Sequence, residues 1–554
     1  MPEKKSNNKF LLPALGAVVF VAGSIAAYLY LKGGPSGDIS GVISAAKVVP
    51  DEALMATYIS TDPKVWAKLE QFGTPEAQQL VTKELENLNK NLSPDNNISY
   101  EQDIKPWIGG VMIALLPPNP VKPAQSTPQA AQENNILMVV GIKDKIGALN
   151  FANKLKSQKD IKVQEIDYKG EKIIEASGKG SPTYTAVLNG TYIVFAPEKP
   201  AVQQAIDTFK GEPSFATKEG ADSLLTRSVK LENTLAQVYV PDYPSMVKQL
   251  VTTNPQSAQL PPQSLAQLKQ VKSMVAGVGV DDAGVRMKAS ANLDPQLVTF
   301  QYQNSSARVV SQLPTDTLAL ISGQGIKTWW SSVVEQSKDV PELKQTIEQA
   351  RSQLQFIGLD LDKDVFGWMD REFGFAAIPS NQGVLAQVGF GGAFVFQTSD
   401  RKAAEATLNK LDTLVQAQSL KVAKRDIGGK EVTEWLIPQQ GALLSHGWLN
   451  GDTVFIALGG PVGEAIANRK GQALDSSDSF KAATGSLQRP NSGYLYLDMD
   501  KTLALIDRFT TAQQQPIPPE AKTIMSSIHG LGVTATNPSK SISEVEMLLA
   551  LKKK

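Results

Sequence analysis

The chain has 554 residues, of which 42% are apolar, with 55 basic and 55 acidic side chains, two histidines and no cysteine. The length predicts at least two domains, and the apolar content excludes wholesale disorder. The zero net charge argues against binding nucleic acid by neutralising phosphates, and the missing thiol excludes disulfides, thiolate nucleophiles and cysteine-ligated metal centres.

Residues 10–31 form an apolar segment without a charged side chain. Because about 20 apolar residues in a helix span a bilayer core, we expect a transmembrane anchor here. Lysines concentrate before the segment, which predicts a cytoplasmic tail at 1–9 and an exported body. Small residues at 24–26 leave a cleaved signal peptide as the alternative. The glycine-containing stretch 32–46 is typical of a flexible tether.

The body that follows contains the same short words twice, in the same order. Order kept over such a distance indicates an internal repeat. We therefore predict two tandem repeats, at 47–300 and 311–554, joined by a linker at 301–310. The matching words are 50–54 with 314–318, 103–107 with 364–368, 188–190 with 449–451, and 277–280 with 530–533.

Each repeat is expected to mix strands and helices. In the first, apolar periodicity predicts a helix over 63–92, and the Pro- and Gln-rich stretch 117–134 is typical of a solvated loop. Gly-bearing breaks then separate alternating strands, a hairpin signal, before a helix at 198–209 and a terminal hairpin within 275–291. The predicted fold is α+β: an N-terminal transmembrane helix followed by two antiparallel-sheet-plus-helices modules.

Three segments carry a family resemblance. The opening at Pro50, Trp66 with the following 72–75, and the segment 103–107 resemble the exported family known as domain of unknown function 3352. Together with the anchor and Gln-rich loops, the body is similar to cyanobacterial members of that family. The resemblance implies export and architecture, with the body on the periplasmic or thylakoid-lumenal side, and brings no catalytic residues.

Two short patterns suggest chemistry and are weighed against plain structural roles. Residues 360–364 space three aspartates like the start of a calcium loop, but Val365 and Arg371 stand where glycine and a bidentate acid are needed. We expect a solvated turn instead. Ser245 and Lys248 have the Ser-x-x-Lys spacing, but its companion motifs are absent, so a helix start is expected.

Glycines and histidines give no stronger signal. The stretch 389–392 lacks the spacing of a dinucleotide fingerprint and is interpreted as a bend between strands. His446 and His529 can each act as a base in principle, but no triad order surrounds them. We therefore predict no catalytic, cofactor-binding or metal-binding residue, no cofactor, and no enzyme.

Tryptophans divide into shared and unshared positions. Those at 66 and 330, and at 107 and 368, match between the repeats, which predicts core packing. Trp329, Trp435 and Trp448 belong to the second repeat alone. They are predicted as a partner surface, since Trp is enriched at binding hot spots, with packing between the repeats as the alternative.

The leading functional hypothesis is a non-catalytic, membrane-anchored scaffold or assembly factor for an integral membrane protein or complex. The second is an exported carrier of a lipid or other apolar ligand on a concave sheet. A carboxylate-dependent hydrolase is the third. An apolar cavity favours the carrier, and an exposed patch containing Trp435 or Trp448 favours the scaffold.

Overall fold

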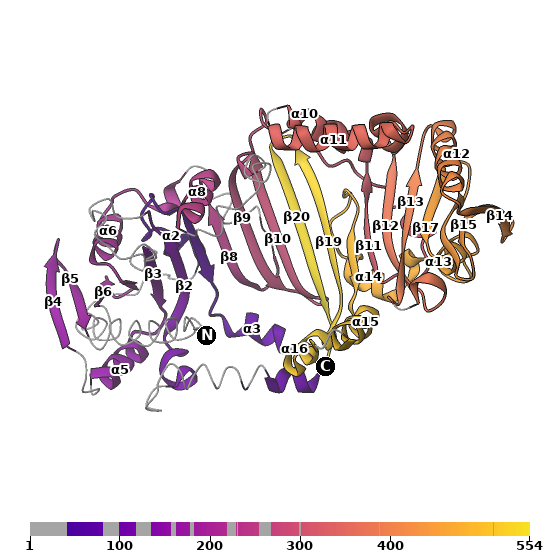
Figure 1. The fold of residues 1–554 in the computed structure, drawn as a ribbon. Coiled ribbons are helices and arrows are strands. Elements are labelled where there is room, and N and C mark those ends of the chain that lie inside the picture. Colours follow the sequence, from indigo (N-terminus) through magenta and orange to yellow (C-terminus); the bar gives the residue numbers. More distant parts are fainter. Residues whose placement is uncertain are drawn as a thin grey trace, which may run out of the picture.

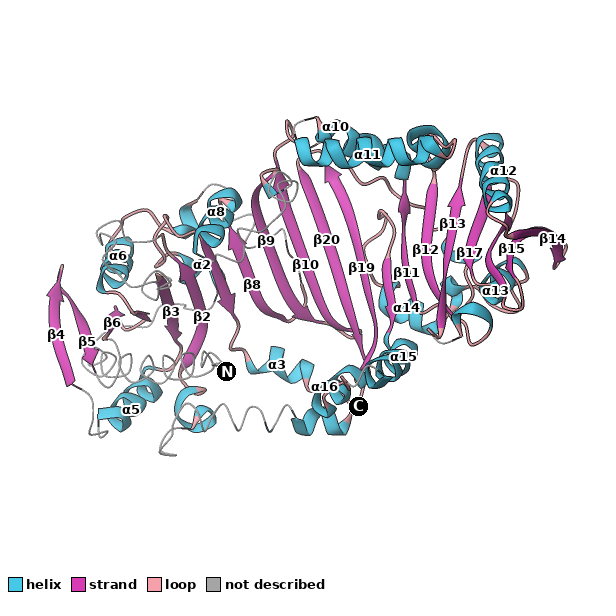
Figure 2. Cartoon of the chain, in the orientation of Figure 1, coloured by secondary structure: helices cyan, strands magenta, loops and turns pink. Residues whose placement is uncertain are grey.

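The computed structural model describes residues 41–80, 83, 99–117, 135–156, 162–177, 182–218, 229, 231–253, 268–298, 301–338, 340–386, 388–512 and 515–554. These residues form a mixed α+β fold around one sheet of 20 strands, shown by secondary structure in Figure 2. Every neighbouring pair of strands is antiparallel, as the short Gly-bearing turns predict. The predicted α+β class is confirmed at this level.

The first half of the sheet holds strands β1 to β10. From the outer edge inward their spatial order is β4, β5, β6, β7, β3, β2, β1, β8, β9, β10. The strands are β1 (Met55–Ile59), β2 (Ile108–Leu115), β3 (Ile136–Ile142), β4 (Lys162–Tyr168), β5 (Glu171–Ser177), β6 (Thr183–Leu188), β7 (Tyr192–Ala196), β8 (Thr234–Val240), β9 (Val271–Val280) and β10 (Gly284–Leu293).

The second half holds β11 to β20, in the order β14, β15, β16, β17, β13, β12, β11, β18, β19, β20. This is the first half's order with ten added to each strand number. The strands are β11 (Ala319–Gln324), β12 (Glu372–Pro379), β13 (Phe390–Gln397), β14 (Lys421–Ile427), β15 (Lys430–Ile437), β16 (Gly441–Trp448), β17 (Thr453–Leu458), β18 (Leu495–Asp498), β19 (Ile528–Ser539) and β20 (Ile542–Leu551).

The halves join where β10 pairs with β20, in the middle of the sheet (Figure 1). The Arg286 guanidinium bridges the seam, with its Nη1 2.6 Å from Glu546 Oε1 and its Nε 2.6 Å from Asp281 Oδ2. A second contact lies at the chain's end, where the Gly73 N–H donates to the Lys552 carbonyl. Backbone pairing and a buried ion pair therefore hold the halves together.

Helices lie on both faces of the sheet and at the ends of its strands. In the first half they are α2 (Val42–Ala46), α3 (Pro63–Leu69), α5 (Lys145–Lys156), α6 (Lys199–Phe209) and α8 (Tyr243–Thr253). In the second they are α10 (Ile326–Ser337), α11 (Pro341–Phe356), α12 (Arg401–Ala417), α13 (Gly460–Ala467), α14 (Asp478–Thr484), α15 (Met499–Ala512) and α16 (Pro519–Ser526). Short π and 3-10 turns complete the described structure: Tyr100–Ile104, Phe215–Thr217, Val310–Gln312, Leu361–Val365, Gly383–Leu385 and Leu474–Ser476.

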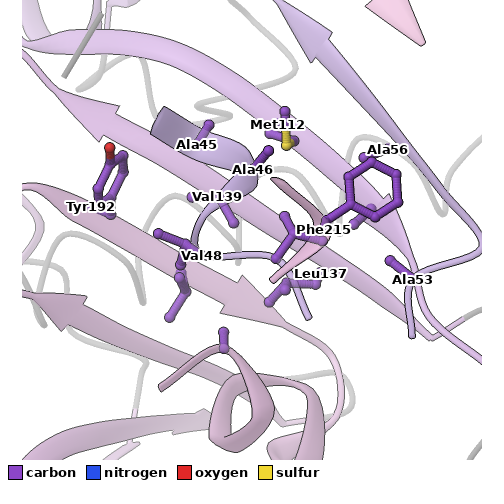
Figure 3. Close-up of a cluster of buried hydrophobic side chains, with 14 of the residues drawn as sticks. Ala45, Ala46, Val48, Ala53, Ala56, Met112, Leu137, Val139, Tyr192 and Phe215 are labelled. Carbon is purple, nitrogen blue, oxygen red and sulfur yellow. The ribbon is translucent and has the colours of Figure 1, made fainter. Parts of the chain in front are cut away.

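The main cores lie on one face of the sheet. In the first half α2, α6 and Phe215 pack against β2, β3 and their neighbours, with Met112, Leu137 and Val139 buried (Figure 3). In the second half α13 and α14 pack on the corresponding strands and bury Phe455 and Phe480 among others. Two smaller cores lie under α5, around Trp107, and under α12, around Trp368.

Some predicted elements differ from the structure or lie outside it. The predicted helix over 63–92 is wrong as one element: α3 ends at Leu69, and Gly73 has φ +94°, a left-handed value that breaks an α-helix. Within the residues described, no helix is long and apolar enough to span a bilayer. The predicted anchor 10–31 and most of the loop 117–134 fall outside those residues. The terminal hairpin is confirmed as β9 and β10.

Candidate functional site

The matching segments 103–107 and 364–368 form the same arrangement in both halves. We call it the clasp: a buried tryptophan that donates to the carbonyl of an aspartate, whose carboxylate binds a lysine. In the first half Trp107 Nε1 donates to the Asp103 carbonyl at 2.6 Å, and Lys154 Nζ lies 2.7 Å from the Asp103 carboxylate. Trp107 is 3% exposed, so its buried N–H needs this partner. The clasp fixes the start of β2 against α5.

In the second half Trp368 Nε1 donates to the Asp364 carbonyl at 2.9 Å, and Lys410 Nζ lies 2.7 Å from the Asp364 carboxylate. Trp368 is 2% exposed. Core packing is therefore confirmed for this tryptophan pair. It is wrong for Trp66, which is 43% exposed and donates to the Ser60 carbonyl.

The aspartates at 360–364 point to separate partners. Asp360 accepts from the N–H groups of the turn, and Asp362 binds Arg351 and the Trp330 Nε1. The hydrogen bond from Arg351 lowers the pKa of Asp362 despite the opposing effect of burial. Among the described residues, no three acids or histidines are grouped so that they could hold a metal ion. The solvated-turn interpretation agrees with this geometry.

The serine and glycine motifs take structural roles. Ser245 N–H and Oγ both donate to the Asp242 carboxylate at the start of α8, as a helix start requires. Gly391 lies within β13, where a Cβ would collide with the Leu458 carbonyl. The close backbone approach, and not phosphate binding, explains this glycine.

The two histidines each meet an aspartate. His446 Nε2 lies 2.9 Å from Asp412 Oδ1, and Trp435 Nε1 donates to the same oxygen at 2.7 Å. Burial acts to raise the pKa of Asp412, but the hydrogen bonds from His446 and Trp435 outweigh it, so the pKa lies below its usual value. Asp412 lies on α12, Trp435 on β15 and His446 on β16, so the cluster holds α12 against both strands.

His529 lies at the other end of the second half. Its Nδ1 is 3.0 Å from Asp500 Oδ2, and Lys552 Nζ is 2.5 Å from the other oxygen of Asp500. These contacts attach the start of α15 to β19 and to the residue that follows β20.

The three unshared tryptophans are dispersed. Trp329 on α10 is 47% exposed. Trp435 is half-buried in the Asp412 cluster, and Trp448 is half-buried with the Arg401 guanidinium 4.1 Å above its ring centre. The structure thus does not gather the predicted partner surface into one exposed patch.

A wide apolar surface, which the motif analysis missed, lies on the face of the central strands opposite the main cores. We call it the open face and define it by two rows of directly paired residues. The first is Val278, Met287, Met547, Val533, Leu495 and Ile321, and the second is Val285, Leu549, Leu531, Leu497 and Ala319.

The open face is accessible. Ile321 is 52% exposed, Leu495 41% and Met287 38%, while the other members are partly buried. Figure 1 shows the central strands running between α10 and α11 at one end and α3, α15 and α16 at the other. At the α3 end, Val65, Leu69 and Val278 all pack against a small buried core of Phe72, Leu235 and Val280. The apolar face therefore has helices along its border.

The sequence contains a pattern that marks this face, but the pattern alone would assign its bulky residues to the core. In the words 277–280 and 530–533 glycine alternates with a bulky apolar residue, and alternation normally assigns the bulky side to the core. Gly530 and Gly532 are instead the buried side, because α14 packs so closely that a Cβ on Gly532 would collide with the Ala483 carbonyl. Leu531 and Val533 consequently face outward.

No curated protein matches the chain. Crystal form III of TP0453 matches with a TM-score of 0.27 and 10% identity over 45% of this chain and 79% of that one. Crystal form IV of TP0453 matches with a TM-score of 0.26 and 9% identity over 46% and 83%. The family described as protein of unknown function DUF3352 matches residues 14–551, and the chain belongs to that family.

Proposed function

We propose that this protein is a membrane-anchored, extracytoplasmic carrier of an apolar ligand, which it holds on the open face. The observation that supports this function is the run of accessible apolar residues across the seam, including Ile321, Leu495 and Met287. Contiguous exposed apolar surface is costly in water and is typical of binding sites. The body acts by apolar contact and not by bond chemistry.

The proposal includes features that the sequence predicts. The segment 10–31 serves as the anchor, and the body lies in the periplasm or, in a cyanobacterial host, the thylakoid lumen. The two halves are two copies of one module. The identical order of strands in both halves supports this. The face crosses the seam, where β10 and β20 contribute paired residues, and it extends mainly over strands of the second half.

The scaffold for an integral membrane protein is the second candidate. Trp329 and Phe356, on the neighbouring helices α10 and α11, are 47% and 91% exposed and favour it. Exposed aromatic side chains are frequent anchors of protein partners. Trp435 and Trp448 support it less, since each already has an internal partner.

One purification separates the two functions. The tagged full-length chain is isolated from membranes after crosslinking, and one eluate is analysed for proteins and for extracted apolar small molecules. A carrier yields a small molecule that is lost in Ile321→Lys and retained in Phe356→Lys. A scaffold yields a stoichiometric protein that is lost in Trp329→Lys. Recovery of no apolar molecule with the unaltered chain would contradict the carrier.

A further inference from the structure

We infer that the ligand of the open face is the acyl chains of a membrane glycerophospholipid, an inference that rests on the proposed carrier function. The face consists of aliphatic and thioether side chains, among them Met287, Met547 and Ile321. Flexible methionines adapt to a flexible apolar partner. The surface therefore suits polymethylene chains.

The surface offers nothing to a polar ligand. Its backbone N–H and C=O groups are engaged in the sheet ladders between β9, β10, β20, β19 and β18. A buried polar group without a hydrogen-bond partner is costly. A sugar, nucleotide or phosphate would lose its hydration here without replacement, so the lipid headgroup stays in water outside the two rows.

The composition also argues against a protein partner on this face. Interfaces between proteins are enriched in Tyr, Trp and Arg and carry about one hydrogen bond per 100–200 Å². The two rows that define the open face contain only Val, Leu, Ile, Met and Ala. The exposed tryptophan nearest in the chain, Trp329, belongs to α10 and not to these rows.

The dimensions accommodate an acyl chain. The first row crosses from β9 to β11. Five strand spacings correspond to about 24 Å. One leaflet of a bilayer is about 15 Å of hydrocarbon, half of the full core. A chain lying across the strands therefore fits within the row.

The predicted anchor places the protein beside a source of lipid, the bilayer itself. The tether predicted at 32–46 is wrong at its end, because Val42–Ala46 form α2 and bury Ala45 and Ala46. Between the anchor's end at residue 31 and the first described residue, Gly41, lie residues 32–40. Fully extended, that stretch spans about 30 Å. The body that begins at Gly41 is thus kept close to a bilayer, whose lipids are at a high effective concentration. Among apolar ligands, membrane lipid is the one that this tether keeps within constant reach.

The test uses the full-length chain reconstituted in vesicles of phosphatidylcholine that contain a trace of the same lipid with a photoreactive group at the end of one acyl chain. After illumination, mass spectrometry locates the crosslinks. We expect them on β10, β11 and β18 to β20. Ile321→Lys places a charge in the apolar site and should reduce crosslinking about tenfold, while Phe356→Lys leaves it unchanged.

Controls make each outcome decisive. Equal denaturation midpoints for the two variants and the unaltered chain establish that folding is intact; if Ile321→Lys fails this check, Ile321→Thr replaces it. Crosslinks confined to residues 10–31 would overturn the lipid inference. In a parallel sample, a photoreactive isoprenoid that labels the open face when the phospholipid does not would overturn the inference and leave the carrier standing. Labelling by neither probe would contradict both.

Discussion

The two halves of the sheet share a clasp but differ in what surrounds it. Asp103 with Trp107 in the first half, and Asp364 with Trp368 in the second, make matching hydrogen bonds and a matching lysine ion pair. The second half alone adds the Asp412 cluster between α12 and the sheet. The clasp therefore belongs to the architecture that both halves share, and the cluster belongs to the second half.

The neighbouring residues explain the difference in packing. The first half has Phe151 from α5 on Trp107, with ring centres 5.5 Å apart. The second half has Thr407 at the comparable place, where its hydroxyl donates to the Asp364 carbonyl, and Trp368 packs on Phe396 instead. The helix α5 thus contributes an aromatic side chain to the first clasp, whereas α12 contributes a hydrogen bond to the second.

Substitutions that break the clasps should have the largest effect on stability. Trp107→Ala and Trp368→Ala should each lower the free energy of unfolding by about 3–5 kcal/mol, because each removes a large buried ring and leaves a cavity. Urea denaturation followed by circular dichroism measures it. Trp66→Ala, at a 43% exposed position, is the control and should cost less. If Trp107→Ala lowers the free energy of unfolding no more than Trp66→Ala does, the first clasp does not stabilise the fold.

A smaller effect tests the cluster that one half has alone. His446→Ala should cost about 1–3 kcal/mol, since it removes a hydrogen-bond partner from the largely buried Asp412. Denaturation of His446→Ala and of Trp435→Phe beside the unaltered chain measures it. A neutral His446→Ala would mean that Trp435 alone satisfies the carboxylate.

The same cluster should make the stability of the fold depend on pH. The pKa of Asp412 is lower in the folded state than in the unfolded state. Its contribution to the free energy of unfolding is therefore fully present above the unfolded pKa and is lost as the pH falls through the folded pKa. We expect the urea midpoint to fall on acidification below about pH 4, and Asp412→Asn to reduce that fall. An identical acid profile in Asp412→Asn would sink this assignment.

The smallest effect concerns Trp448. The Arg401 guanidinium stacks 4.1 Å above its ring, but the arginine is 44% exposed, so Arg401→Ala should cost about 0.5–1 kcal/mol. Arg401→Lys should recover part of it. A Trp448 fluorescence spectrum unchanged by Arg401→Ala would contradict the stacking.

Several features were predictable because they depend on local pattern. Proline and hydrophobic periodicity mark α6 at Lys199–Phe209, and the glycine-bearing words mark the turns between β4 and β5 and between β6 and β7. The helix over 63–92 was not predicted correctly, because apolar periodicity continues through Gly73 while its backbone does not. The buried tryptophan pair was found, because both words carry the same spacing.

The candidate site was not predictable in the same way. Trp435 and Trp448 stand out in the sequence, yet their partners Asp412 and Arg401 come from α12, some distance away along the chain. No local rule pairs them. The open face was missed because its residues come from strands of both halves that meet only at the seam.

Turn chemistry and hydrophobic periodicity are enough to predict the α+β class and the antiparallel pairing, and three short segments are enough to predict the family. The side of the central strands that is covered could be learned from the folded structure alone. Alternation sorts residues into two faces but does not say which face a helix will cover. Around Gly532 the close approach of α14 settles that choice, and Leu531 and Val533 are left outside.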